Sequence, residues 1–384
     1  MEHPYFQRLR RIQQLGLTSY VYPGALHTRF HHALGAMHLM GQAIEVLRAK
    51  GVEITEEEGE AAAIAILLHD IGHGPFSHAL EHTILEKIEH EDVSTLFMER
   101  LNEEFKGRLT LAIKIFEGEY PKKFLHQLVS SQLDMDRLDY LTRDSFFTGV
   151  HEGVIGYDRI IKMLNVKEDM LVVEEKGIYS IEKFIISRRL MYWQVYLHKT
   201  VLCAEVMLVK VLMRAKELAR QGVELFATPA LAFFMKQDRT IEDFKQHSEV
   251  LEHYANLDDS DLFVAMKIWQ KHPDLILSTL SYSIIQRKLF KIELQKEAFG
   301  YNKITELRKK AQEKYQLDET NIDYFVFTDA TSNRAYSHKQ DKINILFKNG
   351  EILDIAYASD QLNIQLLSAQ VVKYYLCYPK EILN

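Results

Sequence analysis

Cysteine is scarce in this chain: two of the 384 residues are cysteines, Cys203 and Cys377, and they form no Cys-x-x-Cys pair. The sequence therefore argues against a disulfide framework and fits a reducing compartment. Long hydrophobic runs are also missing, because the longest aliphatic stretch, residues 61–68, is far too short to span a bilayer. The first residues, MEHPYFQRLRRI, contain no apolar signal region. We expect a cytoplasmic protein with no membrane partner.

An excess of basic residues is absent as well. The 47 lysines and arginines are outnumbered by 54 aspartates and glutamates, which gives a formal net charge of −7. A dedicated nucleic-acid binder usually carries a basic surface, so nucleic acid is not indicated as a partner. The balance still permits a local basic pocket for a small anionic molecule.

Repeats, low-complexity segments and flexible linkers are missing, so we expect tightly packed units. Helical periodicity dominates the first three quarters, with a short hairpin around Lys176–Gly177 and then one very long helix over residues 180–220. After about residue 320 the pattern alternates with period two, and Asn349–Gly350 predicts a hairpin. The sequence predicts a mostly α protein with a small C-terminal α+β unit. We divide it into a helical core (1–235), a helical segment packed on the core (236–319) and the α+β unit (320–384).

Histidine, in contrast, is concentrated: nine of the 17 histidines lie between residues 27 and 90. His69 and Asp70 directly follow the aliphatic run 61–68, which predicts that they end a buried helix. A buried carboxylate beside a buried imidazole is costly unless a cation compensates the charge. Neighbouring helical residues point about 100° apart, so both can reach one ion only near the helix end, where Gly72 interrupts the helix. We therefore predict a metal site at this helix end.

Two further segments offer ligands for such an ion. HTRFHHALG contains His27, His31 and His32, and LDMDRLDYLTRD contains aspartates at positions 134, 136, 139 and 144. A helix over the second segment places carboxylates, a phenol and a guanidinium on one face. The long helix carries a stripe that suits a phosphate-bearing ligand with a ring, formed by Arg188, Tyr192, Tyr196 and Lys199. Each stripe alone also fits a solvated helix face, but their occurrence together favours a site.

Taken in order, HTRFHHALG, HDIGHGPFSH and DMDRLDYLTRD resemble the HD-domain phosphohydrolase superfamily. Within it they are similar to the deoxynucleoside triphosphate triphosphohydrolase branch, which includes a mammalian enzyme with SAM and HD domains. The opening FQRLRRIQQLGLTSYVYPGALHTRF resembles the same branch, and the resemblance covers about residues 4–200. It implies that the helical core is an HD domain. It also implies that dNTPs are hydrolysed to deoxynucleoside and triphosphate by attack of a metal-activated water on the α-phosphate.

The resemblance implies a role for each matching residue. The implied metal ligands are His32, His69, Asp70 and Asp136, with His31 outside the set. The implied catalytic residues are His73, Glu81, His90 and Glu91, where His90 or His73 would protonate the leaving sugar oxygen. The implied phosphate contacts are Arg29, His73, His78, Arg137, Arg188 and Lys199. The implied sugar and base contacts are Gln14, Leu15, Tyr140, Asp144 and Tyr196.

Some positions depart from the family pattern. Arg137 stands where the mammalian relative has lysine, and Leu197 replaces a polar residue near the base, so the base preference is open. Gln7 and Arg10 match positions of a nucleotide-activator site between subunits. Relatives carry a further segment before FQRLRR that completes this site, so we expect half of it to be absent here.

The implied cofactor is one divalent ion per site, and a His/His/Asp/Asp set accepts Mn, Mg, Fe, Ni, Co or Zn. The implied partners are a dNTP substrate and further copies of the chain in a homo-oligomer, a dimer or a tetramer. Two other functions stay open. One is a nucleotidase or phosphodiesterase that acts on another phosphate ester, and the other is a nucleotide- or nucleic-acid-binding regulator with weak activity.

Overall fold

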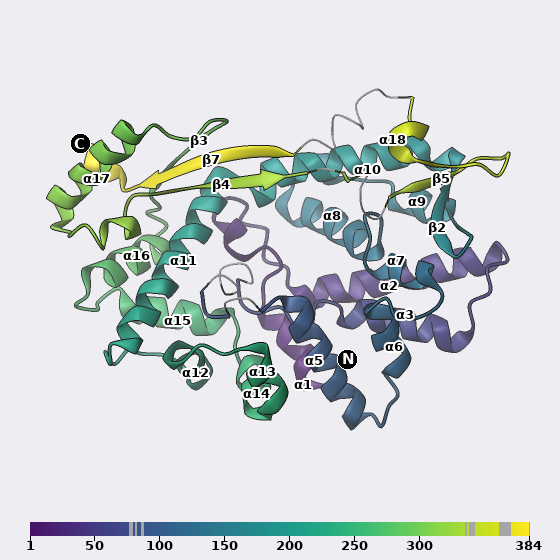
Figure 1. Cartoon of the computed structure of the whole chain (residues 1–384), viewed down its shortest axis with the longest axis horizontal. Coiled ribbons are helices and arrows are strands. Elements are labelled where there is room, and N and C mark those ends of the chain that lie inside the picture. Colours follow the sequence, from purple (N-terminus) through teal and green to yellow (C-terminus); the bar gives the residue numbers. More distant parts are fainter. Residues whose placement is uncertain are drawn as a thin grey trace.

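Helices dominate the computed structural model, which describes residues 1–76, 80, 83–85, 88–334, 336–337, 342–360 and 370–383 (Figure 1). The few strands are short and most of them follow residue 290. The predicted fold class, mostly α with small sheets toward the C-terminus, is confirmed. Within these residues, none of the helices combines the length and the apolar character that a membrane crossing requires.

Three helices from the first part of the chain pack together and carry the candidate site: α2 (Arg29–Ala49), α3 (Glu56–Leu68) and α8 (Met135–Thr148). A capping box begins α3, because Thr55 Oγ1 accepts the Glu58 N–H at 3.1 Å and the Glu58 carboxylate accepts the Thr55 N–H at 2.8 Å. The other elements of this region are α1 (Pro4–Gln7), η1 (Arg8–Arg11), η2 (Gly16–Tyr20), α5 (His90–Glu104), α6 (Thr110–Phe116), α7 (Lys123–Val129), η3 (His151–Gly153) and α9 (Tyr157–Met163).

The single long helix predicted over residues 180–220 is wrong. The chain forms α10 (Ile178–Met191), a π turn η5 (Tyr192–Tyr196) and α11 (Lys199–Arg220). The Leu197 N–H donates to the Tyr192 carbonyl at 2.6 Å, five residues back, and this lengthened turn rotates the side chains that follow. The stripe predicted for one regular helix is therefore interrupted before Lys199.

The hairpin predicted around Lys176–Gly177 lies earlier in the chain. Strands β1 (Leu164–Lys167) and β2 (Met170–Glu174) pair around Glu168–Asp169, whose φ angles are 53° and 61°. Such turns usually carry glycine or asparagine, so these two acidic residues gave no signal. Lys176–Gly177 belongs instead to the 3-10 turn η4 (Glu175–Gly177).

Helices and two small sheets make up the rest of the chain. The helical elements are α12 (Pro229–Lys236), α13 (Ile241–Gln246), α14 (Ser248–Ala255), α15 (Asp259–Trp269), α16 (Leu275–Ile285), α17 (Tyr301–Tyr315), η6 (Ile322–Tyr324), α18 (Ile355–Ala358) and η7 (Lys380–Leu383). One sheet is antiparallel in the order β3 (Lys291–Gln295), β7 (Val371–Tyr378) and β4 (Phe327–Asn333). The other has the order β1, β2, β5 (Asn344–Leu346) and β6 (Ile352–Asp354).

Both sheets join residues after 320 to earlier parts of the chain. Strand β7 pairs with β3, and β5 runs parallel to β2 with Asn344 opposite Val172. The predicted turn at Asn349–Gly350 does connect the antiparallel strands β5 and β6. The boundaries predicted at residues 235 and 319 stay predictions.

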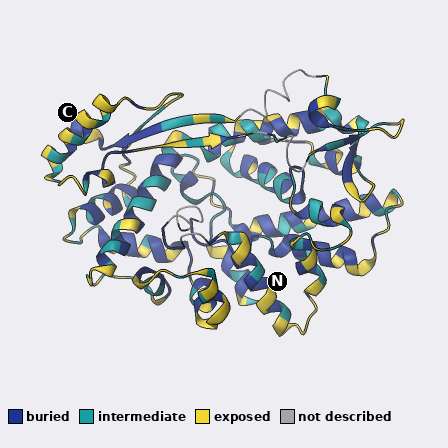
Figure 2. Cartoon of the chain, in the orientation of Figure 1, coloured by how far each residue is buried: buried dark blue, intermediate teal, exposed yellow. Residues whose placement is uncertain are grey.

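Two buried hydrophobic clusters divide the interior. Figure 2 shows the buried residues of the chain in dark blue. Helix α2 passes from one cluster to the other between Ala33 and Ala36, and α3 does so between Ile66 and Leu67. His32 and the residues that follow α3 therefore lie near the boundary between two rigid cores, where their positions are fixed from both sides.

Candidate active site

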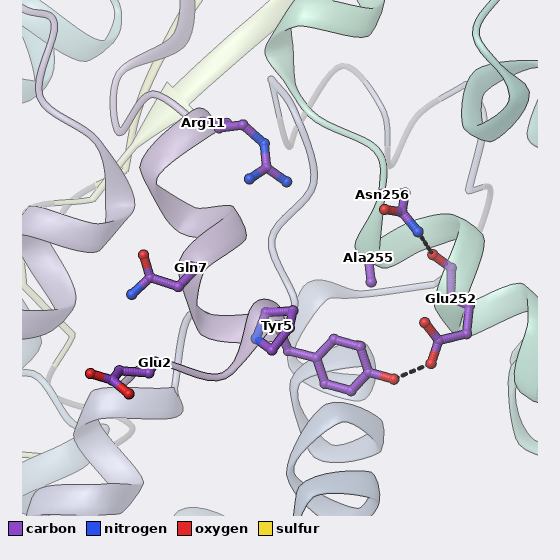
Figure 3. A pocket seen from close by; sticks show the side chains of 8 residues that line it. Glu2, Tyr5, Gln7, Arg11, Glu252, Ala255 and Asn256 are labelled. Atoms are coloured by element: carbon purple, nitrogen blue, oxygen red, sulfur yellow. Dashed lines mark hydrogen bonds between the residues drawn. The ribbon is translucent and has the colours of Figure 1, made fainter.

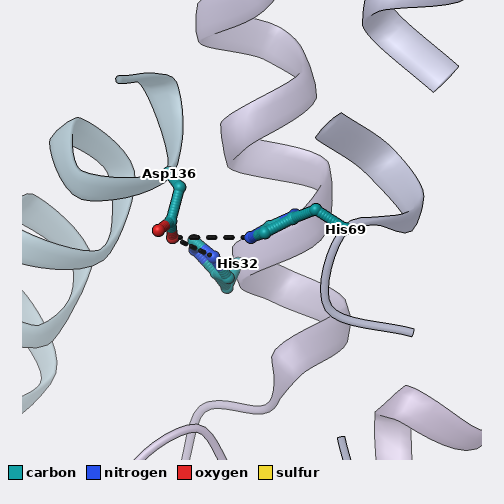
Figure 4. A group of neighbouring side chains, drawn as sticks. All are labelled: His32, His69 and Asp136. Carbon is teal, nitrogen blue, oxygen red and sulfur yellow. Dashed lines mark ion pairs between the residues drawn. The ribbon is translucent and has the colours of Figure 1, made fainter. Parts of the chain in front are cut away.

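The ends of three helices place three side chains around one point (Figure 4). His32 lies in the first turn of α2, His69 directly follows α3, and Asp136 lies in the first turn of α8. Asp136 Oδ1 is 3.0 Å from His32 Nε2 and 3.5 Å from His69 Nε2. The three ligand atoms lie within 4.8 Å of one another, so one ion can contact all of them.

Asp70 joins this group. Its Oδ1 is 3.3 Å from His69 Nε2, and its Oδ2 is 3.8 Å from His32 Nε2. The same Oδ2 accepts a hydrogen bond from Arg29 Nη1 at 2.7 Å, so the carboxylate lies between the imidazoles and a guanidinium. The structure thus brings together all four side chains predicted as metal ligands.

Outer contacts aim both imidazoles inward. Asp139 Oδ2 lies 2.8 Å from His32 Nδ1, and the Ile66 carbonyl lies 2.6 Å from His69 Nδ1. Because these oxygens only accept, each Nδ1 carries a hydrogen, and each Nε2 can offer its lone pair to a metal ion that displaces its proton. Both Nε2 atoms are buried and face the carboxylates of Asp136 and Asp70. Two imidazoles and two carboxylates with these open Nε2 atoms fit a divalent metal ion.

The acids and imidazoles also shift each other's pKa. Burial lowers the pKa of His32, but its contacts with Asp136 and Asp139 outweigh burial and raise that pKa well above the usual range. Burial raises the pKa of Asp70, but the neighbouring imidazoles and Arg29 outweigh it and hold that pKa well below the usual range. The site therefore favours positive charge between its carboxylates, which a metal ion supplies when it displaces protons.

A second group of side chains lies beside Asp70. His73 Nε2 is 3.2 Å from Asp70 Oδ1, and the His73 ring stacks on the His90 ring with centroids 3.7 Å apart. Glu91 Oε1 is 3.2 Å from His90 Nε2. Burial and the charge of Arg29 lower the pKa of His73 to about 3, so this ring is neutral at neutral pH. Of the predicted catalytic residues, His73 therefore contacts the metal group directly, and His90 and Glu91 are connected to it through His73.

A buried polar group lies on the other side of His32. The Tyr196 hydroxyl donates to Asp144 Oδ2 at 2.8 Å, and His27 Nε2 is 2.7 Å from Asp144 Oδ1. The Tyr140 ring connects this group to the metal group, because its centroid is 6.2 Å from that of Tyr196 and 6.5 Å from that of His32. The predicted sugar contacts Tyr140, Asp144 and Tyr196 thus lie together.

A short backbone bridge connects the segment of the predicted sugar contacts Gln14 and Leu15 to the Asp144 group and to the metal group. The N–H of Gln14, which precedes Leu15, donates to the His27 carbonyl at 3.0 Å, and the Arg29 N–H donates to the Ile12 carbonyl at 3.0 Å. The bridge therefore fixes His27 beside the sugar group and Arg29 beside the metal group.

The other predicted phosphate contacts are less closely gathered. Arg137 lies next to Asp136 in α8, where its Nε is 3.1 Å from Asp134 Oδ2. The Arg188 guanidinium lies over the Tyr192 ring, and the exposed Lys199 begins α11. Two further predicted residues lie outside the described part of the chain: His78 and Glu81.

Comparison with known proteins assigns the family. The HD domain model matches residues 29–144, and the HD associated region model matches residues 155–239. The uncharacterized protein YwfO of Bacillus subtilis is 32% identical over 395 residues, covering 98% of this chain and 87% of YwfO. A phosphohydrolase of Bacteroides thetaiotaomicron with a known crystal structure is 56% identical, with a TM-score of 0.95 over 99% of this chain and 94% of that chain. The chain belongs to the HD-domain phosphohydrolases.

This HD-domain phosphohydrolase is also similar to proteins named deoxynucleoside triphosphate triphosphohydrolase SAMHD1. The human protein is 30% identical over 243 residues, which are 52% of this chain and 39% of SAMHD1. The chain therefore matches less than half the length of SAMHD1. The resemblance predicted from the sequence motifs is confirmed.

Two residues of the HD site have roles that the sequence did not predict. His27 was a candidate ligand, but it contacts Asp144 instead and stacks on the Phe147 ring with centroids 4.4 Å apart. Asp139 was one of several candidate carboxylates, and it proves to hold His32. The glycine at position 35 was the signal in the sequence, and the structure gives its reason, because a Cβ there would lie 1.9 Å from Asp139 Oδ1.

Replacing Asp139 with asparagine is expected to weaken metal binding by about 10–100-fold, the usual cost of losing an outer partner of a ligand. Asparagine keeps the shape but removes the charge that holds His32 Nδ1. Calorimetric titration of Mn²⁺ into metal-free protein measures the change. Asp274→Asn is the control, because Arg214 binds Asp274 as Arg143 binds Asp139, but Asp274 does not contact the site. Unchanged affinity in Asp139→Asn would contradict the assignment.

The predicted activator residues Gln7 and Arg10 line surface cavities. Gln7 lines a cavity of about 330 Å³ with Tyr5 and Asn256 (Figure 3). Arg10 donates from Nε to Gln7 Oε1 at 2.8 Å and lines a second cavity of about 490 Å³. The four metal-ligand candidates line neither cavity, so any activator effect would act at a distance. The activator role stays a prediction.

Proposed function

We propose that this HD-domain phosphohydrolase cleaves dNTPs into deoxynucleoside and triphosphate. One observation carries the proposal: a continuous series of contacts runs from His90 through Asp70 and His32 to Asp144. The series contains groups suited to phosphate, to a metal ion and to a sugar hydroxyl, and their order supports a nucleotide as the substrate. The similarity to SAMHD1 supports the same substrate class.

Arg29 and the ion suit the triphosphate. Arg29 uses one N–H on Asp70 and retains others for phosphate oxygens. A bound divalent ion would lower the pKa of a water molecule and polarise the α-phosphate. The water oxygen would bond to the α-phosphorus and release a proton to solvent, the bond from phosphorus to the sugar O5′ would break, and deoxynucleoside and intact triphosphate would be the products.

His90 is the proposed proton donor to the leaving O5′. Glu91, 3.2 Å from His90 Nε2, and the stacked His73 ring hold the His90 ring in its orientation. Without this proton the sugar would leave as an alkoxide, which is a poor leaving group.

Asp144 is the proposed partner of the 3′-hydroxyl. Each of its carboxylate oxygens has one contact, from His27 or Tyr196, and keeps a lone pair for a further hydrogen bond. Gln14 and Leu15 are proposed to pack under the sugar and to leave no room for a 2′-hydroxyl. Ribonucleoside triphosphates should therefore be poorer substrates.

Product analysis in ¹⁸O-labelled water tests the reaction. Each dNTP is incubated with Mn²⁺ or Mg²⁺, with and without added dGTP. The products are separated by chromatography, and their masses are measured by mass spectrometry. We expect unlabelled deoxynucleoside and triphosphate with one ¹⁸O atom, because water attacks phosphorus and not carbon. Release of monophosphate or inorganic phosphate would contradict the proposal. Turnover of cyclic or monophosphate esters alone would favour a phosphodiesterase or nucleotidase, and binding without turnover would favour a regulator.

We also propose that the enzyme is a homo-oligomer, a dimer or a tetramer, as the resemblance to the triphosphohydrolase branch implies. Light scattering of the purified protein with and without dGTP measures the assembly. A monomer under both conditions would contradict this part of the proposal.

A further inference from the structure

The loop that follows α3 is held by side chains from three distant elements. Ser94 Oγ, in α5, donates to the His69 carbonyl at 2.7 Å and accepts the Gly72 N–H at 2.9 Å. The hydroxyl of Tyr254, in α14, donates to the Gly72 carbonyl at 2.7 Å. Every one of these contacts fixes backbone within three residues of Asp70.

The third of these side chains belongs to Arg8, in η1, whose Nη1 donates to the Ile71 carbonyl at 2.8 Å. Arg8 is fully buried, and its guanidinium lies 5.5 Å from the Phe97 ring centre and 5.1 Å from that of Tyr254. Its second hydrogen bond also goes to a backbone carbonyl, that of Tyr254, at 3.5 Å. Among the described residues, no carboxylate lies within ion-pair distance of this guanidinium.

A buried cation without an acid is expensive. Packing alone does not require one here, because an unbranched apolar side chain of similar length would fill the same space between the two rings without the cost of desolvating a charge. The contacts with aromatic faces recover part of this cost. The position of Arg8 therefore indicates a function that requires a charged donor at the Ile71 carbonyl.

We propose that Arg8 is a positioning residue of the metal site: it fixes the peptide plane of Ile71 and thereby aims the preceding Asp70 carboxylate at the ion. A charge-assisted hydrogen bond is stronger than a neutral one and tolerates less movement. Asp70 must face His32, His69 and Arg29 at once, so a small rotation of the backbone that carries it would break these contacts. The inference depends on the metal site alone and not on the substrate.

Metal affinity tests the inference without any substrate. Mn²⁺ is titrated by calorimetry into metal-free full-length protein, and Co²⁺ absorption spectra report the coordination geometry. Arg8→Met, which keeps length and loses the donor, is expected to weaken Mn²⁺ binding by about 10–100-fold and to change the Co²⁺ spectrum. Arg8→Lys keeps a charge and one donor and should recover part of the affinity.

Arg48 offers a matched control at the opposite end of α3. Its guanidinium also binds two backbone carbonyls, those of Ile54 at 2.9 Å and Thr55 at 2.6 Å, and in addition pairs with the exposed Glu56 carboxylate at 3.2 Å. It lies away from the metal group. Arg48→Met should lower thermal stability and leave Mn²⁺ affinity and the Co²⁺ spectrum unchanged. A merely structural role for Arg8 would give the same pattern in Arg8→Met, and that result would overturn the inference.

If Arg8→Met does not fold, two milder variants test the inference. Arg8→Lys and Tyr254→Phe each weaken one contact with the loop and keep the volume of the site nearly constant. We expect each to lower Mn²⁺ affinity several-fold. Wild-type affinity in both would overturn the inference.

Discussion

Replacement of Asp70 or His69 with alanine is expected to remove the bound metal and to reduce turnover by about 1000-fold or more, since an ion contributes several kcal/mol to the transition state. Each change removes a group that lies within 3.8 Å of another predicted ligand. Elemental analysis of the purified proteins and turnover of the best substrate give the two readouts. The fold should persist, because both residues directly follow α3 and belong to neither hydrophobic cluster.

Two controls separate this effect from damage to the structure. Asp70→Asn keeps the side-chain volume beside Arg29, which limits the cost of leaving that buried cation without its acid. His126→Ala is matched to His69→Ala, because the His126 Nδ1 also contacts a backbone carbonyl, that of Ile115, at 3.0 Å. His126→Ala should keep metal and turnover. A His69→Ala or Asp70→Ala protein with full metal content and wild-type turnover would refute the ligand assignment.

Replacement of Gly72 with alanine is the second change with a large expected effect. A Cβ at this position would lie 2.2 Å from the His90 carbonyl oxygen and 2.3 Å from the Ser94 backbone nitrogen. Both obstacles are backbone atoms, so either the loop after α3 or the start of α5 must move. We expect turnover to fall by about 100-fold, the scale associated with a displacement of about 1 Å. Overpacking should also lower the free energy of unfolding by about 1–3 kcal/mol.

Gly41→Ala provides the matched control. Gly41 lies within α2, and a Cβ there meets nothing within 4 Å. Alanine should therefore raise stability by about 1 kcal/mol through helix propensity and leave turnover unchanged. Thermal unfolding, turnover and crystal structures of both variants make the comparison. A Gly72→Ala protein with wild-type turnover would show that the loop and His90 need not keep their present spacing.

Local motifs predicted the metal-ligand candidates well because each of them lies in a short segment at a helix end. The Gly72 break did end α3 next to His69, and the first turns of α2 and α8 brought His32 and Asp136 to the same point. The C-terminal strands were predictable for a related reason. Period-two alternation and the turn at Asn349–Gly350 are both local signals.

The side chains that hold the loop after α3 could not be predicted from local signals. Arg8, Ser94 and Tyr254 meet the loop after α3 from 63, 22 and 182 residues away, and no spacing rule connects them to it. The break at Tyr192–Tyr196 was missed for a different reason. The flanking residues keep helical propensity, and the π turn lies where a distant side chain contacts the backbone, because the Tyr22 hydroxyl donates to the Gln194 carbonyl.

The parallel pairing of β2 with β5 has a consequence for synthesis of the chain. Strand β2 leaves the ribosome roughly 170 residues before its partner, and at about 5–20 residues per second the wait is on the order of 10–30 s. During this time the nascent chain presents Val172 and Val173, both buried in the finished protein, on an unpaired strand edge. Unpaired apolar edges recruit other chains, so protection by a chaperone is most valuable to this protein between emergence of β2 and emergence of β5.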